Sequence, residues 1–273
     1  MQSVPFKVKT NRHEAFEVIG GELEAGVIFL CDHASNFIPQ AYDNLGLLDY
    51  DLGRHIAYDI GAETVTRTLA AAFNAPAILS CFSRLLIDPN RGADDPTLIM
   101  RLSDGAIIKG NATIGNAEIE QRKIQFYTPY HEAIKTVIDK SLSAQKMPVL
   151  VSIHSFTRVI GERERPWHLG VLWDNDPRLS IHLLETLRSL GNLVVGDNQP
   201  YDGALAGDTL NIHATQRGLA NTLIEVRNDL ISTKADAVKW GERLAKVLYP
   251  LLNSPDLHKI KFCESRTSLL KRH

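Results

Sequence analysis

Residues 27–33 read Val-Ile-Phe-Leu-Cys-Asp-His, and residues 149–154 read Val-Leu-Val-Ser-Ile-His. Each stretch is an apolar run with the length and β-branched content of a buried strand. A histidine closes each run, His33 in the first and His154 in the second. Open α/β sheets bind ligands in the crevice at the carboxyl ends of their strands. We therefore expect the two imidazoles to converge on one point.

Strand-like and helix-like segments alternate along the rest of the chain, which is typical of a sheet covered on both faces. The further apolar runs lie at 76–81, 169–173, 192–195 and 222–226, and amphipathic stretches lie at 55–73, 117–142, 179–190 and 235–252. We predict one α/β domain over residues 1–273 with three layers, a mixed and mostly parallel sheet flanked by helices. The polar stretch 90–115 predicts a surface excursion of the kind that frames sites.

The bulk composition is that of an ordinary globular enzyme. Of 273 residues 44% are hydrophobic and 23% charged, and the formal net charge is −2, which does not favour binding to nucleic acid or to a membrane surface. No stretch approaches the roughly 18 apolar residues of a membrane span, and the N-terminus does not resemble a signal peptide, so we expect a cytoplasmic protein. Three widely spaced cysteines indicate neither a disulfide framework nor a cysteine zinc site.

Two histidines and a carboxylate at strand ends suggest a hydrolytic metal centre with one divalent ion, Zn²⁺. His33 and His154 are the predicted histidine ligands. Catalytic zinc sites usually add a carboxylate as third protein ligand and leave one position for water. Asp51 is one candidate, although it is equally placed to cap the 55–73 helix. The other candidates for the third position are Asp32, Asn36, Asp59 and Asp88.

Glu225 lies inside the apolar run at 222–226, where a carboxylate needs a partner or a raised pKa. One interpretation is an ion pair with Arg227 or another arginine. The other is a general base that takes a proton from the attacking water and passes it to the departing nitrogen. We favour the second, because a metal site gives the buried charge a purpose.

The stretch Ser83–Arg91 carries two arginines, Arg84 and Arg91, with Asp88 and Asn90 between them. Arginines can hold the carboxylates of an acidic small-molecule substrate through bidentate forks. Alternatively, Arg84 pairs with Asp88 to hold the loop. The candidate substrate-binding residues are Arg84, Asn90, Arg91 and Arg165.

Several motifs taken together resemble the N-formylglutamate amidohydrolase family. They run in order from about residue 26 to 231 and read CDHASNFIP, HIAYDIGA, SRLLIDPNR, PYH, VSIHSFT, RPWHLGVLW, DNQPY and IEVRNDLI. The resemblance implies an architecture similar to zinc carboxypeptidases and aspartoacylases, with the metal at the strand ends. It also implies hydrolysis of an N-acyl amide, in which N-formyl-L-glutamate and water give formate and glutamate.

The resemblance also implies residue roles. His33 and His154 would be zinc ligands, Glu225 the catalytic carboxylate, and Arg84 and Arg91 the anchors for substrate carboxylates. The related carboxypeptidases carry a glutamate three residues after the first histidine. Here that position is Asn36, a poor zinc ligand, so Asp51 is taken as its replacement.

Two other functions remain open on the sequence alone. One is a metal-free protein that binds an acidic ligand on a hydrolase scaffold. The other is a zinc peptidase or peptidoglycan amidase, which would need a wide groove rather than a closed pocket. A serine hydrolase is not supported, because the chain has no Gly-x-Ser-x-Gly motif.

Overall fold

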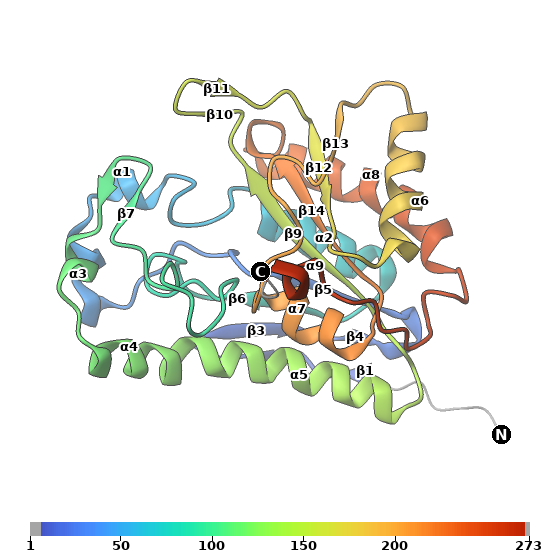
Figure 1. Cartoon of the computed structure of the whole chain (residues 1–273), viewed down its shortest axis with the longest axis horizontal. Helices are drawn as coiled ribbons and strands as arrows, with labels where there is room; N and C mark the ends of the chain where they lie inside the picture. Colours follow the sequence, from blue (N-terminus) through green and yellow to red (C-terminus); the bar gives the residue numbers. More distant parts are fainter. Residues whose placement is uncertain (1–6, 271–273) are drawn as a thin grey trace.

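An eight-stranded mixed sheet forms the centre of the molecule (Figure 1), in the order β13-β12-β14-β9-β5-β6-β3-β2. The structure is a computed structural model and describes residues 7–270. The strands of this sheet are β2 (Asn11–Arg12), β3 (Phe16–Ile19), β5 (Val27–Cys31), β6 (Ala77–Ser80), β9 (Val149–Phe156), β12 (Leu169–Leu172), β13 (Val195–Asp197) and β14 (Asn221–Arg227).

Short hairpins and helices make up the remaining regular structure. The hairpins pair β1 (Lys7–Val8) with β4 (Gly21–Glu22), β7 (Leu102–Ser103) with β8 (Ala106–Ile107), and β10 (Val159–Ile160) with β11 (Arg163–Glu164). The helices are α1 (Asp49–Leu52), α2 (Ala62–Phe73), α3 (Lys109–Ala112), α4 (Asn116–Arg122), α5 (Thr128–Ser143), α6 (Pro177–Ser189), α7 (Thr209–His213), α8 (Lys234–Leu252) and α9 (Arg266–Leu270). In the part of the chain that the structure describes, no helix has the length and apolar character needed to cross a bilayer.

The four central strands β14, β9, β5 and β6 run parallel, so their carboxyl ends lie at the same edge of the sheet. The strands outside them, β12 on one side and β3 on the other, are antiparallel to their central neighbours. The prediction of a mixed sheet flanked by helices is therefore confirmed. The register of β14 and β9 places Glu225 directly beside His154.

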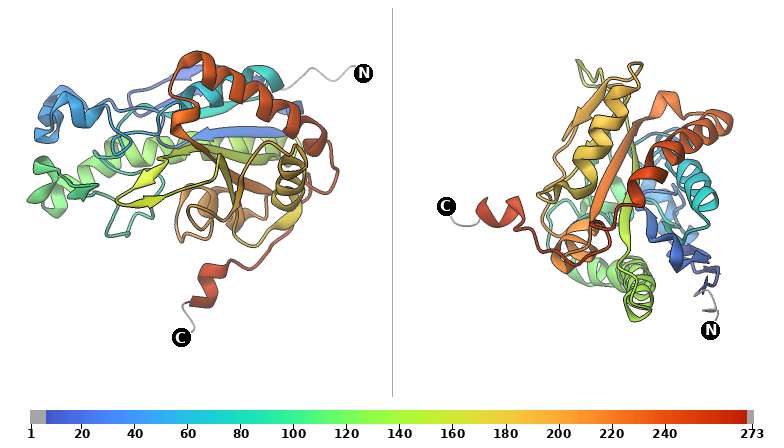
Figure 2. Two further views of the ribbon diagram at one scale, coloured as in Figure 1. Left: turned by 90° about the horizontal axis from the view of Figure 1, so that it is seen from above. Right: turned by 90° about the vertical axis from the view of Figure 1, so that its right-hand side faces the viewer.

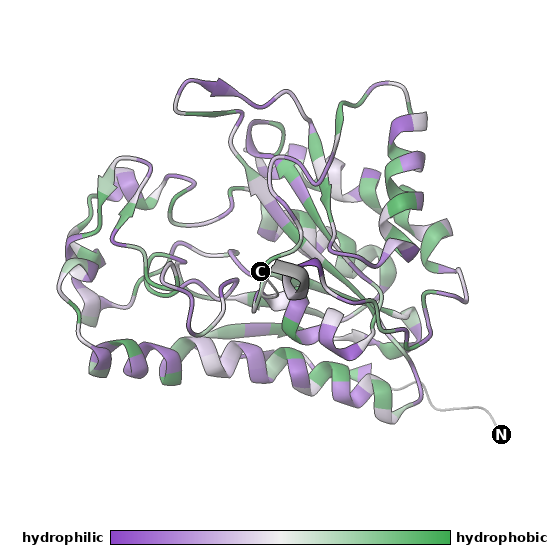
Figure 3. Cartoon of the chain, viewed as in Figure 1, coloured by the Kyte–Doolittle hydropathy of each residue, from purple (hydrophilic) through white to green (hydrophobic). Residues whose placement is uncertain are grey.

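Each face of the sheet has its own apolar core, because side chains alternate along a strand. On one face Phe29 of β5 packs in a cluster with Leu69 of α2 and residues of α6 and α8. On the other face Leu30 packs in a cluster with Ile134 of α5. In Figure 3, hydrophobic and hydrophilic residues also alternate along the helices α4 and α5. Figure 2 shows that α8 lies beside α2 and that α9 projects from the body of the molecule.

Five of the six strands and the helices at 179–190 and 235–252 that the sequence predicts are confirmed as β5, β6, β9, β12, β14, α6 and α8. The sixth, predicted at 192–195, begins only at Val195 and forms β13. The predicted helix at 55–73 begins only at Ala62. Gly61 precedes it with a φ of +81°, and a Cβ at Gly61 would lie 2.2 Å from the Ile231 carbonyl oxygen. The left-handed backbone of Gly61 thus separates α2 from a non-helical turn.

The predicted helix at 117–142 is divided by a π-helical turn, Lys123–Tyr127, between α4 and α5. The excursion at 90–115 contains the β7–β8 hairpin and α3. The sequence interpretation did not include the strands before residue 23, the β10–β11 hairpin or α7. These elements are two to five residues long, too short for a periodic pattern to be recognised.

Candidate metal centre and active site

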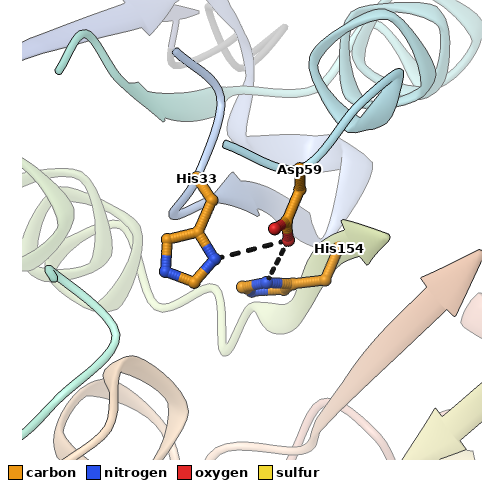
Figure 4. A group of neighbouring side chains, drawn as sticks. All are labelled: His33, Asp59 and His154. Carbon is orange, nitrogen blue, oxygen red and sulfur yellow. Dashed lines mark hydrogen bonds and ion pairs between the residues drawn. The ribbon is translucent and has the colours of Figure 1, made fainter. Parts of the chain in front are cut away.

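Two imidazoles and a carboxylate meet at the carboxyl end of the central strands (Figure 4). His33 follows β5, Asp59 lies in the turn before α2, and His154 lies in β9. Asp59 Oδ2 is 3.3 Å from His33 Nδ1 and 2.8 Å from His154 Nδ1. One candidate ligand atom from each residue lies within 4.8 Å of the others, and all three side chains are buried. His33 and His154 therefore converge as expected.

Each imidazole is also held from behind by a second carboxylate. His33 Nε2 lies 2.7 Å from Asp88 Oδ1, and His154 Nε2 lies 2.9 Å from Asp32 Oδ2. Histidines that bind metals usually donate their other ring N–H to such a carboxylate, which fixes the tautomer and raises the basicity of the ligand nitrogen. Both Nε2 atoms therefore have a partner outside the group, and both Nδ1 atoms face Asp59.

The donor set fits a divalent cation. A neutral imidazole has one N–H and one lone pair. If each Nε2–H is donated outward and the rings are neutral, each Nδ1 turns a lone pair towards Asp59 Oδ2, and the three electron-rich atoms repel unless a positive charge lies among them. That charge is either a metal ion or a proton on the ring, and against the effect of burial Asp32 and Asp59 raise the pKa of His154. Two histidine nitrogens and one carboxylate oxygen are the ligands of a common class of catalytic zinc sites.

Asp32 is the most extensively bonded of these carboxylates. Besides His154, it accepts hydrogen bonds from Tyr130 Oη at 2.9 Å, Ser152 Oγ at 2.8 Å and Thr209 Oγ1 at 2.7 Å. Burial alone would raise the pKa of Asp32, but the hydrogen bond and charge of His154 outweigh it and hold the pKa well below its usual range. Asp32 therefore stays ionised and joins β5, β9, α5 and α7 behind the site.

Asp59, and not the predicted Asp51, completes the group. Asp51 lies in α1, where it forms an ion pair with Arg54 Nη1 at 3.0 Å. The backbone fixes Asp59 instead. The Asp59 amide donates to the His33 carbonyl at 2.9 Å, and the Ser155 amide donates to Asp59 Oδ2 at 3.2 Å.

Asp59 is one of the alternative third ligands on the sequence, where it falls inside the stretch 55–73 that is predicted as one helix. The glycine two positions later, Gly61, is the signal that a turn intervenes. Asn36 lies apart from the group as well, and its side-chain amide donates to the Leu52 carbonyl at 2.8 Å.

Glu225 is buried beside His154 without a hydrogen-bond partner for Oε2 in the described chain. Its ion pair with Arg227 is not formed, because Arg227 Nε bonds to Asp229 at 2.7 Å. Burial raises the pKa of Glu225 to about 7, opposed by the charge of His154 and reinforced by Asp59. The carboxyl is therefore poised to take up or release a proton near neutral pH.

A cavity of about 350 Å³ opens onto this group. Its walls include His33, Asp59, His154 and Glu225 together with three of the predicted substrate-binding residues, which are Arg84, Asn90 and Arg91. The buried acid Asp208 also lines it, and burial raises the pKa of Asp208 to about 7. No sequence feature singled out Asp208, since its burial depends on segments that are distant in the chain, such as those of Asp32, Arg91 and His154.

The three arginines in and near the cavity differ in whether their guanidinium groups are bonded to a carboxylate. Arg84 bonds to Asp88 Oδ2 through Nε at 3.1 Å and Nη2 at 2.7 Å, which is the loop-holding alternative left open by the sequence. The guanidinium of Arg91 makes no hydrogen bond or ion pair with any residue between 7 and 270. Arg165 Nη1 contacts only neutral oxygens, Tyr201 Oη at 3.0 Å and Thr157 Oγ1 at 3.4 Å.

Comparisons with known proteins give a consistent result. The family model described as N-formylglutamate amidohydrolase matches residues 25–232. The crystal structure of a gene product of Agrobacterium tumefaciens is 35% identical and superposes with a TM-score of 0.83, covering 89% of this chain and 97% of that one. The crystal structure of N-formylglutamate amidohydrolase from Ralstonia eutropha JMP134 is 17% identical with a TM-score of 0.60, covering 87% and 99%. A search of curated proteins gives no match.

Proposed function

Because the chain belongs to the N-formylglutamate amidohydrolase family, whose members are hydrolases of amide bonds, we propose that it is metal-dependent and cleaves N-acyl amino acids. The proposed reaction converts N-formyl-L-glutamate and one water molecule into formate and L-glutamate. One observation carries the proposal. A single cavity holds a buried His-Asp-His donor set, a carboxyl without a hydrogen-bond partner and an unpaired guanidinium.

In this proposal His33, Asp59 and His154 hold a zinc ion, in the manner of the zinc carboxypeptidases. When bound, the ion would lower the pKa of a water molecule and polarise the acyl carbonyl. The protein contributes the orientation of the two imidazoles. Asp88 and Asp32 accept their Nε2–H groups and leave the Nδ1 lone pairs directed at the site.

Glu225 is the proposed proton carrier. It takes the proton of the attacking water as the carbon–oxygen bond forms, and it gives a proton to the amide nitrogen as the carbon–nitrogen bond breaks. Two features support this role. Glu225 lies beside His154 in the register of β14 and β9, and its raised pKa of about 7 suits both acceptance and donation near neutral pH.

Arg91 is the proposed anchor for a substrate carboxylate, since its guanidinium forms no hydrogen bond or ion pair in the described chain and its charge acts on Asp88 and Asp208 only at longer range, whereas Arg84 is bonded to Asp88. Arg165 does not itself line the cavity, but it is the proposed contact for a second carboxylate because its side-chain partners, Tyr201 and Thr157, are uncharged and do line it. Two available cationic groups favour a dicarboxylic substrate. A cavity of about 350 Å³ supports a small molecule over a peptide or a peptidoglycan strand.

The proposal is tested by measuring release of the free amine from N-formyl-L-glutamate, N-acetyl-L-glutamate and N-formyl-L-leucine by zinc-loaded protein. We expect N-formyl-L-glutamate to be the best of the three. We expect Arg91→Met to raise the KM for N-formyl-L-glutamate about 10- to 100-fold, because the variant loses a charge-assisted hydrogen bond to the substrate. Arg243→Met, at a half-buried residue of α8 that does not line the cavity, is the matched control. If no acyl amino acid is hydrolysed, the proposed function fails.

A further inference from the structure

Three side chains at and just before the start of α5 have hydrogen-bond partners behind the cavity, which are two backbone carbonyls and one carboxylate. Tyr130 Oη reaches Asp32, as described above. Tyr127 Oη donates to the Arg91 carbonyl at 2.9 Å, and His131 Nε2 lies 3.0 Å from the Pro89 carbonyl oxygen. Two of the three donors therefore bind the loop 88–91, which carries the free guanidinium.

His131 is in turn held by His213, at the end of α7. His131 Nδ1 lies 2.8 Å from His213 Nε2, and the rings stack with centroids 5.1 Å apart and planes 19° from parallel. The two residues are 8% and 4% exposed, so water does not compete for these bonds. Neither histidine belongs to the donor group at Asp59.

The direction of the bonds fixes both tautomers. A carbonyl oxygen only accepts, so His131 Nε2 carries the proton that is donated to Pro89. A neutral His131 then has a lone pair on Nδ1, and His213 must donate to it from Nε2. Burial lowers the pKa of both histidines, that of His213 to about 3, which keeps the pair neutral at ordinary pH.

Thr209 of α7 also contacts the loop 88–91. The Thr209 amide donates to Asn90 Oδ1 at 3.2 Å, and Thr209 Oγ1, which donates to Asp32 at 2.7 Å, lies 3.3 Å from the Pro89 carbonyl oxygen. The two ends of the loop have different tasks, since Asp88 holds His33 and Arg91 faces the cavity. The placement of Pro89 between them decides where the Arg91 side chain begins.

We propose that His131 and His213 are positioning residues that set the loop 88–91 and so direct Arg91 at the carboxylate of the substrate. The inference rests on the proposed function for the role of Arg91. The arrangement of the pair itself does not depend on it. The histidines act through a hydrogen bond to the backbone and touch neither the substrate nor the reacting atoms.

The arrangement is tested on the wild-type chain by long-range ¹H–¹⁵N correlation spectra of histidine-labelled protein. We expect both residues in the Nε2–H tautomer at pH 8, because His131 Nε2 faces the Pro89 carbonyl and His131 Nδ1 faces His213 Nε2. A proton on Nδ1 of the neutral His131 would overturn the proposal without any variant being needed.

The consequence for binding is tested with two variants. His131→Phe keeps a ring but removes the donor, and we expect KM for N-formyl-L-glutamate to rise about tenfold with kcat nearly unchanged. His131→Gln places an amide N–H near the position of Nε2 and should recover most of that loss. His182→Gln on the exposed surface of α6 is the control. Faster amide exchange at Asn90 in the phenylalanine variant, and not in the glutamine variant, would locate the effect at the loop.

Failures of the two proposals are distinguishable. If the wild-type protein hydrolyses no acyl amino acid, the proposed function falls, while the tautomers and the exchange at Asn90 still decide the arrangement of the pair. If the wild-type protein is active and His131→Phe has an unchanged KM, the positioning role is overturned. It is likewise overturned if His131→Gln is as impaired as His131→Phe.

Discussion

Two sets of polar groups at the cavity differ in how completely they are bonded. Behind the donor group, Asp32 accepts four hydrogen bonds, and Asp88 accepts from His33, Arg84 and the Asn90 amide. Among the residues that line the cavity, Glu225 Oε2 has no partner within residues 7–270, and Arg91 forms no ion pair there.

The difference separates groups that must stay fixed from groups that must react. A ligand nitrogen works best when its ring cannot rotate, and a carboxylate behind it provides that restraint. A proton carrier or a substrate anchor needs free bonding capacity, and leaving it unpartnered in a buried place costs stability. The following substitutions test this contrast, beginning with the largest effect that we expect.

Replacing the free carboxyl should have the largest consequence. Glu225→Gln keeps the shape of the side chain but cannot carry a proton, so we expect kcat to fall about 10³-fold. The metal content should not change, because Glu225 is outside the donor group. Steady-state kinetics and metal analysis of the same preparation check this. An unchanged turnover would remove Glu225 from the mechanism.

A change in the donor group should act on metal binding first. Asp59→Asn removes the charge that faces both Nδ1 atoms, and we expect zinc affinity to fall by more than about 100-fold. Competition with a zinc chelator measures it. Asp51→Asn is the matched control, since Asp51 pairs with Arg54 and not with the histidines. Loss of zinc from the Asp51 variant alone would restore Asp51 as the ligand.

A change behind the donor group should have a smaller effect. Asp32→Asn places a neutral amide against His154 Nε2, and we expect zinc affinity to fall about 10- to 100-fold. The melting temperature of the metal-free protein should also fall, since Asp32 links four elements. The buried Asp174→Asn, whose partner is Arg266, serves as the control. Equal zinc affinity in both variants would argue against a role for Asp32 behind the ligand.

The smallest effect should be a pH dependence. Glu225 accepts a proton only when ionised, and burial raises its pKa to about 7. The rate should therefore fall as the pH drops through that pKa, by about tenfold per unit below it. A nearby cation favours the ionised carboxylate, so in the metal-loaded protein this acidic limb of the pH–rate profile lies below pH 7. Profiles of kcat/KM between pH 5 and 9 measure the limb, and its persistence in Glu225→Gln would assign it to another group.

Acid should lower the stability of the folded protein through the carboxylates in and behind the donor group. The pKa values of Asp32, Asp59 and Asp88 are lowered in the folded protein, because the charges of His154, His33 and Arg84 outweigh burial. Groups of this kind stabilise the fold above their unfolded pKa of about 4, and that contribution is lost as the pH falls further.

Three residues of the candidate site could be predicted from local sequence. His33, His154 and Glu225 each stand in or just after an apolar run, and the position of a residue on a buried parallel strand fixes which edge of the sheet it reaches. The carboxylate that completes the donor group could not be predicted this way. Asp51 and Asp59 both precede α2 in the chain, and they differ in that the Asp59 amide donates to the His33 carbonyl and Asp59 Oδ2 accepts from the Ser155 amide.

The sequence by itself determined the alternation of strands and helices, the strand-end histidines and the family, because these depend on periodicity and on residue types in fixed order. Only the tertiary structure decided which carboxylates face the imidazoles and which arginine stays free. Hydrogen-bond partners such as Asp32 and Thr209 are separated by 177 positions. Their meeting depends on how the elements pack, which no local pattern encodes.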